Sequence, residues 1–150
     1  MRFHPSHIAP DVELAEALSG IATVGTEPVK VYSDWEKPTN GLPSDFITIY
    51  LNGDIGGVGY DTPYASGYIM VSLYCKLNDN GSVKKNRIKK ILEAIDDKLD
   101  KKLTENYHFE YDADRYITPT TPNTASGYSI TTLNLRWTTT SNFGKNLNSE

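Results

Sequence analysis

The sequence predicts an α+β domain of two layers, in which a mixed, mostly antiparallel β-sheet carries two helices on one face. The first observation is an amphipathic stretch in the middle of the chain, Ser82 to Leu103. The second is a set of segments in which apolar and polar residues alternate, as they do in strands with one buried face. The third is the order of these segments, α-β-β-β-α-β-β. The 150 residues have the size of one domain.

Residues 1–9 are expected to form an irregular arm, and residues 10–140 the folded core. A short first helix should begin at Pro10, which suits a first helical position, and stop near Gly20. Two loops rich in Pro, Gly and Asn, residues 34–45 and 52–63, should follow. They separate three expected strands, which are Pro28–Ser33, Phe46–Leu51 and Tyr64–Leu77.

The main helix is expected over Val83–Leu103, with Ser82 as its N-cap. Its apolar residues recur at i, i+3, i+4, i+7 and i+11, which is one stripe of an α-helix: Ile88, Ile91, Leu92, Ile95 and Leu99. The remaining positions are mostly charged or polar, so one narrow face should lie on the sheet. The helix should connect two parallel strands by a right-handed crossover.

Two strands are expected after this helix, Tyr107–Tyr111 and Gly127–Thr140. A segment rich in Pro, Thr and Asn, residues 112–126, separates them and is predicted to be a loop. The polar tail, residues 141–150, is expected to be disordered.

Composition excludes several classes of protein. Cys75 is the single cysteine, so no internal disulfide can form. No apolar run reaches the length of a membrane span, and the N-terminus has no apolar core typical of a signal peptide. A net charge of −4 argues against a protein that coats duplex DNA.

No pattern of catalytic or metal-ligating residues is evident, and we expect neither an enzyme nor a cofactor. His4 and His7 have a spacing that binds metals on a helix, but Pro5 lies between them. Cys75 is predicted on a buried strand face, where it acts as a small hydrophobe. Other polar residues at a strand end are expected to cap a turn, although a catalytic role is possible in principle; they are Asp112, Asp114 and Arg115. His108, far from the first two histidines, adds no cluster.

Three surfaces are candidates for contact with a partner. One sheet face should carry Tyr and Met side chains opposite the helices; these are Tyr50, Tyr68, Met70 and Tyr74. They either reflect the preference of strands for Tyr or pack against another subunit. Basic residues crowd the first half of the main helix, against the helix dipole; among them are Lys84, Lys85 and Arg87. They are either solvated or meet an acidic patch on a neighbour, and head-to-tail contacts of that kind generate rings.

The third candidate is the glycine-rich loop, residues 52–63, which includes Gly56, Gly57 and Gly59. It resembles a phosphate-binding loop superficially, but Pro63 and another strand follow it instead of the helix that would hold an anion. A flexible hairpin loop is the better interpretation, and its functional form is a mobile loop that becomes ordered against a partner.

The order, size and acidity of these elements resemble the tail terminator family of long-tailed bacteriophages. The resemblance spans about residues 10–140 and is carried by IAPDVELAEAL, FITIYLNGDIGGVGY, YIMVSLYCKLNDNGSVKKNRIKKILEAIDDKL and GYSITTLNLRWTTT. It implies a structural virion protein that forms a ring, commonly a hexamer, and caps the head-proximal end of the tail tube. Its partners would be copies of itself, the tail tube protein and the head–tail connector.

The resemblance further implies that DNA passes through the ring without specific binding, that no membrane is involved, and that the protein is assembled in the host cytoplasm. A neck or head-completion protein has the same outline. Two other classes stay open. One is a carbohydrate- or peptide-binding module that uses a platform of aromatic residues, Tyr32, Trp35, Tyr60, Tyr64 and Trp137. The other is a small hydrolase or nucleotide-modifying enzyme, for which the sequence offers neither a nucleophile–base pair nor a metal cluster.

Overall fold

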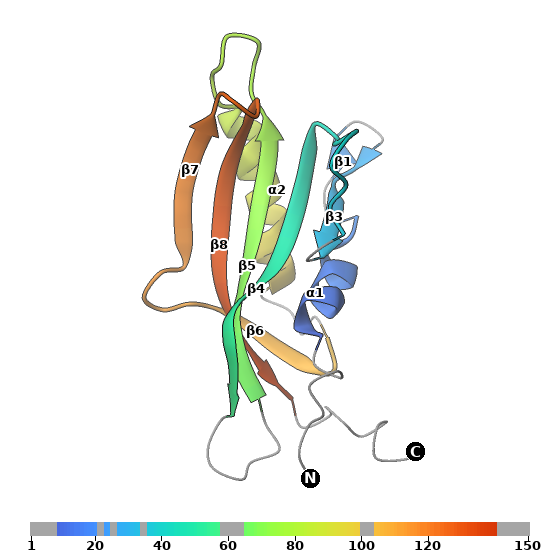
Figure 1. Cartoon of the computed structure of the whole chain (residues 1–150), viewed down its shortest axis with the longest axis vertical. Helices are drawn as coiled ribbons and strands as arrows, with labels where there is room; N and C mark the ends of the chain where they lie inside the picture. Colours follow the sequence, from blue (N-terminus) through green and yellow to red (C-terminus); the bar gives the residue numbers. More distant parts are fainter. Residues whose placement is uncertain are drawn as a thin grey trace.

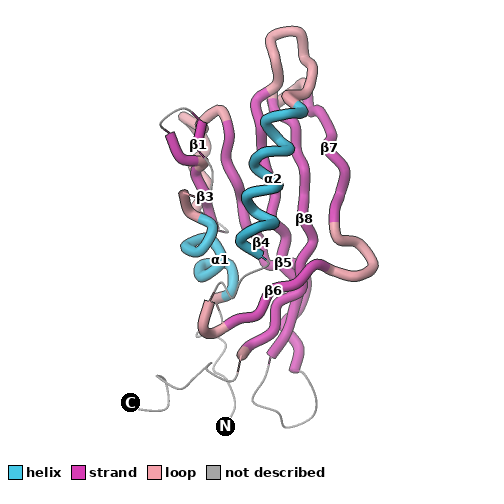
Figure 2. The backbone as a smooth tube through the Cα atoms, turned by 180° about the vertical axis from the view of Figure 1, so that it is seen from behind, coloured by secondary structure: helices cyan, strands magenta, loops and turns pink. Residues whose placement is uncertain are grey.

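The computed structural model describes residues 9–20, 23–24, 27–33, 36–57, 65–99 and 104–140. Within these residues, a sheet of six strands carries both helices on one face (Figures 1 and 2). The predicted α+β class is therefore confirmed. The helices are α1 (Pro10–Leu18) and α2 (Lys85–Leu99). The strands are β1 (Thr23–Val24), β2 (Glu27–Pro28), β3 (Lys30–Ser33), β4 (Asp45–Gly57), β5 (Ala65–Lys76), β6 (Tyr107–Tyr111), β7 (Ile117–Asn123) and β8 (Tyr128–Thr139).

The sheet is built around the long strands β5 and β8. Its order is β3-β4-β5-β8-β6, and β7 also pairs with β8. β7 pairs with the first half of β8 and β6 with the second half. Only β3 and β4 pair in parallel, while β1 and β2 form a separate small hairpin. β5 and β6 both run antiparallel to β8 and hence parallel to each other, so α2 connects two parallel strands as predicted.

The core lies between the sheet and the two helices. Paired strand residues such as Ile49 and Val71 face the helices, and α2 buries Ile88, Ile91 and Ile95 against this face. The predicted stripe is therefore confirmed, with Leu92 and Leu99 half-buried at its margins. Helix α1 lies against β3 and β4 and adds Leu14 and Leu18.

Trp137 is the largest fully buried side chain in the described part of the chain, and it needs a glycine beside it. It pairs with Gly67 across β8 and β5. A Cβ atom at Gly67 would lie 2.9 Å from three atoms of the indole, closer than Cβ atoms normally approach. The ring of Tyr107 closes the other side, edge to face, with ring centroids 5.7 Å apart. Glycine at position 67 therefore makes room for the tryptophan.

The main helix begins later than predicted. Its first described residue is Lys85, and its first backbone hydrogen bond runs from the amide of Ile88 to the carbonyl of Lys84. Ser82 is not the N-cap, because its hydroxyl donates to Asn80 and accepts from Asn78. These bonds stabilise the turn before the helix and leave Ser82 outside it. The predicted end at Leu103 lies outside the described residues, as do the arm at 1–8 and the tail at 141–150.

Two strand predictions were wrong in extent. β4 continues to Gly57, through the whole first half of the segment expected as a glycine-rich loop. Residues 112–126, expected as a loop, contain β7. Six of the seven residues of β7 are exposed, so it has no alternation of apolar and polar residues that would predict a strand.

The two prolines of β7 lie where their nitrogens point away from the sheet. The amide of Asn134 donates to the carbonyl of Tyr116, so the backbone of Tyr116 faces β8 and, by alternation, that of Pro119 faces outward. Pro122 pairs with Ser129 on β8. Ser129 is an odd number of residues from Asn134, whose amide faces β7, so the backbone of Ser129 faces away from β7. The backbone of Pro122 opposite it therefore faces outward too. No ladder hydrogen bond is lost to either proline.

Candidate functional site

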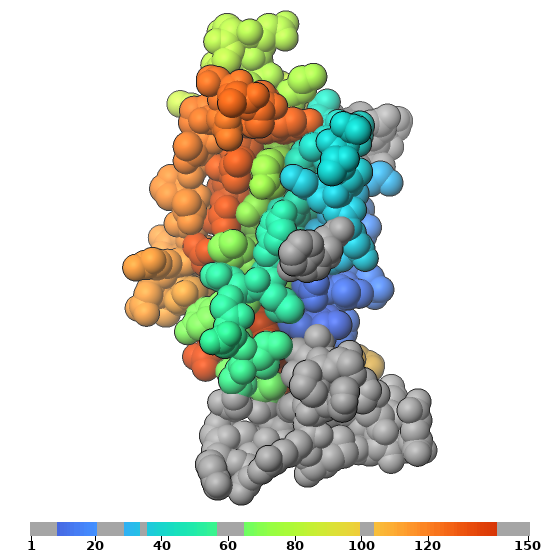
Figure 3. All heavy atoms as spheres, viewed as in Figure 1, coloured from blue at the N-terminus to red at the C-terminus, as the bar shows by residue number. Residues whose placement is uncertain are grey.

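The sheet face opposite the helices is accessible at its centre and lower end. The strand register puts Tyr50 beside Met70 and Tyr68 beside Asn52, so the predicted sharing of one face is confirmed. Tyr68 is 48% exposed, and Tyr50 and Met70 are half-buried. In Figure 3 strands β4, β5 and β8 form this surface directly, and no part of α2 covers it. This face is thus available to a partner.

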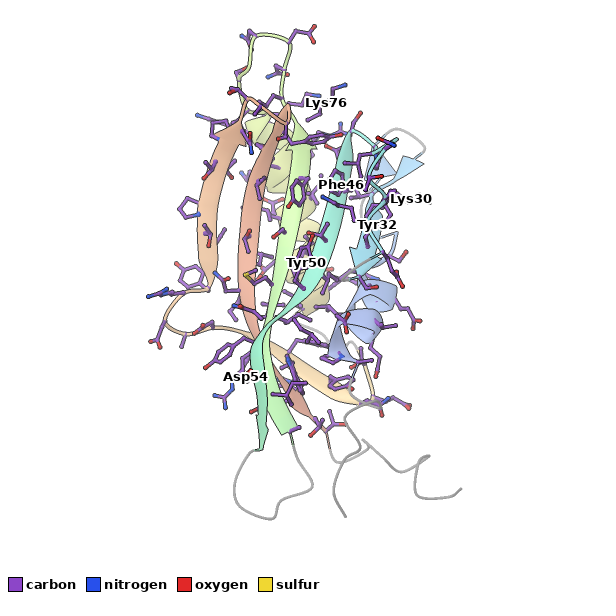
Figure 4. The ribbon with its side chains drawn as sticks, viewed as in Figure 1. Lys30, Tyr32, Phe46, Tyr50, Asp54 and Lys76 are labelled. Carbon is purple, nitrogen blue, oxygen red and sulfur yellow. The ribbon has the colours of Figure 1, made fainter. Side chains whose placement is uncertain are left out.

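The upper end of the same face is occupied by the chain itself. Phe46 is only 1% exposed and stacks on Tyr74, with ring centroids 4.6 Å apart and planes 7° from parallel. Tyr128 and Tyr32 meet the same phenylalanine edge to face, at 5.4 and 6.0 Å. The hydroxyl of Tyr128 donates to the carbonyl of Pro43 at 2.8 Å, which holds the incoming loop over the cluster. Figure 4 labels Phe46 with Tyr50 further along the same strand and Tyr32 on the neighbouring strand.

The consequence for Tyr74 is that much of its ring serves an intrachain cluster. Burial is the largest cause that raises the pKa of its phenol, and the neighbouring Tyr50 raises it further. The ammonium of Lys37 lies 5.6 Å from the centroid of the same ring, a cation–π contact. Of the residues expected on an interface, Tyr50, Tyr68 and Met70 are therefore better placed than Tyr74.

The basic residues at the start of α2 differ in their contacts: Arg87 is held by an ion pair within its own chain, whereas Lys84 and Lys85 are half-buried or exposed. The guanidinium of Arg87 is bonded to the carboxylate of Asp45, with Nε 2.7 Å from Oδ2 and Nη2 on the same oxygen. Lys84 is half-buried and Lys85 exposed. Arg87 thus has a structural partner within its own chain. The lysines are the side chains that a neighbouring molecule would meet.

The glycine-rich segment is a strand with a bulge for as far as the structure describes it. The pairing of β4 with β5 shifts between Asn52 and Gly56, and Gly53 has φ +78°, a left-handed conformation that favours glycine. Gly56 and Gly57 pair with Ser66 and Ala65. Gly59 lies outside the described residues. The bulge leaves Ile55 45% exposed.

A large apolar groove runs between α2 and β7, on the helix side of the sheet. Its volume is about 790 Å³, within the range of ligand-binding clefts. Its apolar walls are Val83, Ile88, Leu92, Tyr111, Tyr116, Ile117 and Leu133. Tyr116 is 60% exposed and Ile117 is 39% exposed. These two large apolar side chains are adjacent in the groove lining, and such adjacent exposed apolar residues are typical of an interaction surface.

Charged side chains flank the groove on the α2 side. Lys85 and Lys89 stand toward the start of the helix, with Glu93 and Asp96 further along. The hydroxyl of Tyr111 donates to Asp96 at 2.7 Å. Lys89 and Glu93 form a loose, exposed pair at 3.9 Å. The groove therefore has a basic end and an acidic end. At the acidic end, the carboxylate of Asp96 already accepts a hydrogen bond.

Sequence reasoning missed this groove because it depends on β7. The apolar pair Tyr116-Ile117 was the available signal, since a loop exposed on all sides has little reason to contain it.

A second, polar hollow of about 470 Å³ lies near Tyr68 and Asn134. Asp112, Asp114 and Arg115 line it. The carboxylate of Asp112 accepts the amide of Asp114 at 3.1 Å, which is the turn-capping role expected from sequence.

Two of the five aromatic residues considered for a binding platform are described by the structure, and they lie on opposite faces of the sheet. Trp137 is fully buried on the helix side of the sheet, whereas Tyr32 belongs to the opposite face. Trp35, Tyr60 and Tyr64 lie outside the described residues. Trp137 was therefore wrong as a member of that platform.

Residues considered for chemistry are scattered or shielded. Cys75 is buried, and burial followed by the nearby Asp45 carboxylate raises the pKa of its thiol to about 12. His108 is exposed on β6, while His4 and His7 are outside the described residues. Among the residues that the structure describes, no three His, Cys, Asp or Glu side chains gather as a metal site.

Comparison with models of known protein families and with curated protein sequences gives no match to this chain. Within the described ranges, no helix has both the length and the apolar character needed to cross a membrane.

Proposed function

We propose that this chain is a structural protein that assembles with copies of itself into a ring, as a tail terminator of a long-tailed bacteriophage. The observation that carries the proposal is the apolar groove between α2 and β7, flanked by the exposed Tyr116 and Ile117. An apolar cleft of this size on an acidic chain is typical of a surface that a partner covers.

Three further features support the proposal. Tyr50, Met70 and Tyr68 give the sheet a second accessible face with aromatic and sulfur-containing side chains, which are enriched at interfaces. The order of the long elements agrees with the outline on which the phage resemblance rests, with β7 added. A net charge of −4 suits a ring through which DNA slides, because like charges do not hold the duplex.

Sedimentation velocity over a range of protein concentrations and salt tests self-assembly, and negative-stain electron microscopy tests ring closure. We expect a discrete oligomer whose images show a central opening. A chain that sediments as a monomer at all concentrations, alone and with tail tubes present, contradicts the proposal.

Tube capping is tested with a polymerising tail tube protein. We expect the added chain to stop elongation and to be seen at one tube end only. Binding to the head–tail connector with no effect on tube length would instead assign a neck or head-completion role.

A further inference from the structure

We infer that the groove between α2 and β7 receives the bulge of β4, at Asp54 and Ile55, from a second copy of the chain. This inference rests on the proposed assembly and names the two surfaces that meet. It assigns the groove one occupant, a segment that every copy carries.

The bulge presents an apolar side chain that its own chain leaves uncovered. β4 has more residues than β5 between the pairs Asn52–Tyr68 and Gly56–Ser66, so its extra residues protrude from the strand pairing as a bulge. Ile55 in this bulge is 45% exposed. Among the described residues, β4 has β3 as a neighbour only up to Ile49, so the bulge lies on a strand with one open side.

The bulge and the groove are complementary in charge as well as in polarity. Asp54 is exposed directly beside Ile55, and the basic end of the groove carries Lys85 and Lys89. With Ile55 against the apolar wall, Asp54 comes to the lysines and not to the carboxylate of Asp96, which accepts the Tyr111 hydroxyl. Complementary charges of this kind fix the register of a contact.

The two surfaces lie too far apart for one chain to satisfy both. Figure 1 places the start of α2 and the far end of β4 at opposite ends of the molecule, and Figure 4 shows Asp54 near that far end. Different patches that fit each other make a heterologous contact, which repeats from copy to copy and closes as a ring when the rotation permits.

Cysteine cross-linking between two separately purified variants tests the contact. Ile55→Cys is mixed with Ile117→Cys under oxidising conditions, and the buried Cys75 is retained in both. We expect a disulfide-linked dimer that contains one copy of each variant. The matched control pairs Ile55→Cys with Val12→Cys, since Val12 on α1 is similarly exposed, at 41%, but is not in the groove.

Sedimentation of point variants supplies the second measurement. Ile55→Asp and Ile117→Asp should each raise the dissociation constant of assembly about tenfold or more, as expected when a buried apolar contact is replaced by a charge. Both residues are exposed in the single chain, so the variants should keep the wild-type circular dichroism spectrum.

The outcomes separate this inference from the proposed function. If wild-type protein assembles but both cysteine pairs cross-link equally, or Ile117→Asp assembles normally, another molecule or another surface fills the groove and the inference is overturned alone. If wild-type protein never assembles, the proposed function fails and the inference with it.

Discussion

Arg87 on α2 and Asp45 on β4 form an ion pair that fastens the start of the helix to the first residue of a central strand. The Asp45 side chain is 5% exposed and that of Arg87 28%. The hydrogen bonds that Arg87 donates to Asp45 are the largest cause and raise the pKa of the guanidinium, while burial lowers it by less. A basic residue in the first turn opposes the helix dipole, and this pair offsets that cost.

Replacing Arg87 by Met should destabilise the fold by about 2–3 kcal/mol, because it leaves the Asp45 carboxylate buried without its cation. The estimate is below the range for fully buried pairs since Arg87 is partly solvated. Chemical denaturation measures it.

Lys89→Met is the matched control, because Lys89 forms only an exposed pair with Glu93. It should cost no more than about 0.5 kcal/mol. Equal losses in the two variants would show that the Arg87–Asp45 pair adds nothing specific.

Gly67→Ala should cost about 1–3 kcal/mol, because the new methyl group would press on the fully buried Trp137 ring. The thermal midpoint and the near-ultraviolet circular dichroism of the tryptophan should both change. Gly56→Ala serves as the control, since no atom lies within 4 Å of its added Cβ and its φ is not positive. A wild-type melt for Gly67→Ala would mean that the indole has room to move.

Stability should fall in alkaline solution. Burial, the largest cause, raises the pKa of Tyr107 from 10.0 to about 12, and burial likewise raises that of Cys75 from 9.0 to about 12. Both groups are neutral at lower pH in the folded and unfolded chain alike, so their contribution is fully present below about pH 9. It is lost as pH rises toward 12, because the unfolded chain releases these protons first.

Denaturation curves between pH 8 and 12 check this dependence. Tyr107→Phe should lose part of the alkaline slope, although it also removes the hydroxyl that accepts the Ala9 amide at 2.8 Å. Tyr68→Phe is the matched control, because it makes the same change at a tyrosine that is 48% exposed. An unchanged slope in Tyr107→Phe would exclude that phenol as a source.

Reversing the charge of Lys84 and Lys85 to Glu should weaken assembly with little change in folding. Lys85 flanks the groove, and Lys84 precedes it at the helix start. Light scattering should show a dissociation constant raised several-fold, with a smaller effect at high salt where such charges are screened. Lys90→Glu is the control, because Lys90 is exposed on the same helix outside the groove lining. An effect of Lys90→Glu that is as large per substituted lysine as that of the double variant would point to net charge alone.

The parts of the fold with a strong period were predictable, and those without one were not. Ile88, Ile91 and Ile95 recur at helical spacing because all three pack on the sheet, and this placed the main helix. β7 is held by pairing with β8 and by a hydroxyl contact between Thr120 and Thr131, so no local pattern marks it.

The candidate surfaces divide in the same way. The alternation along β4 and β5 was enough to put Tyr50, Tyr68 and Met70 on one face. The Arg87–Asp45 pair and the groove join residues far apart in the sequence, and neither spacing nor composition encodes such a meeting.

The outward-facing prolines of β7 also affect how the sheets of separate copies of this protein can pair with one another. A further strand laid along Pro119 and Pro122 would find no amide hydrogens at those positions, and edge prolines are a known barrier to amyloid-like stacking. Backbone pairing with another copy along that border is therefore interrupted at both positions, which hinders the sheets of crowded molecules from merging into fibrils there.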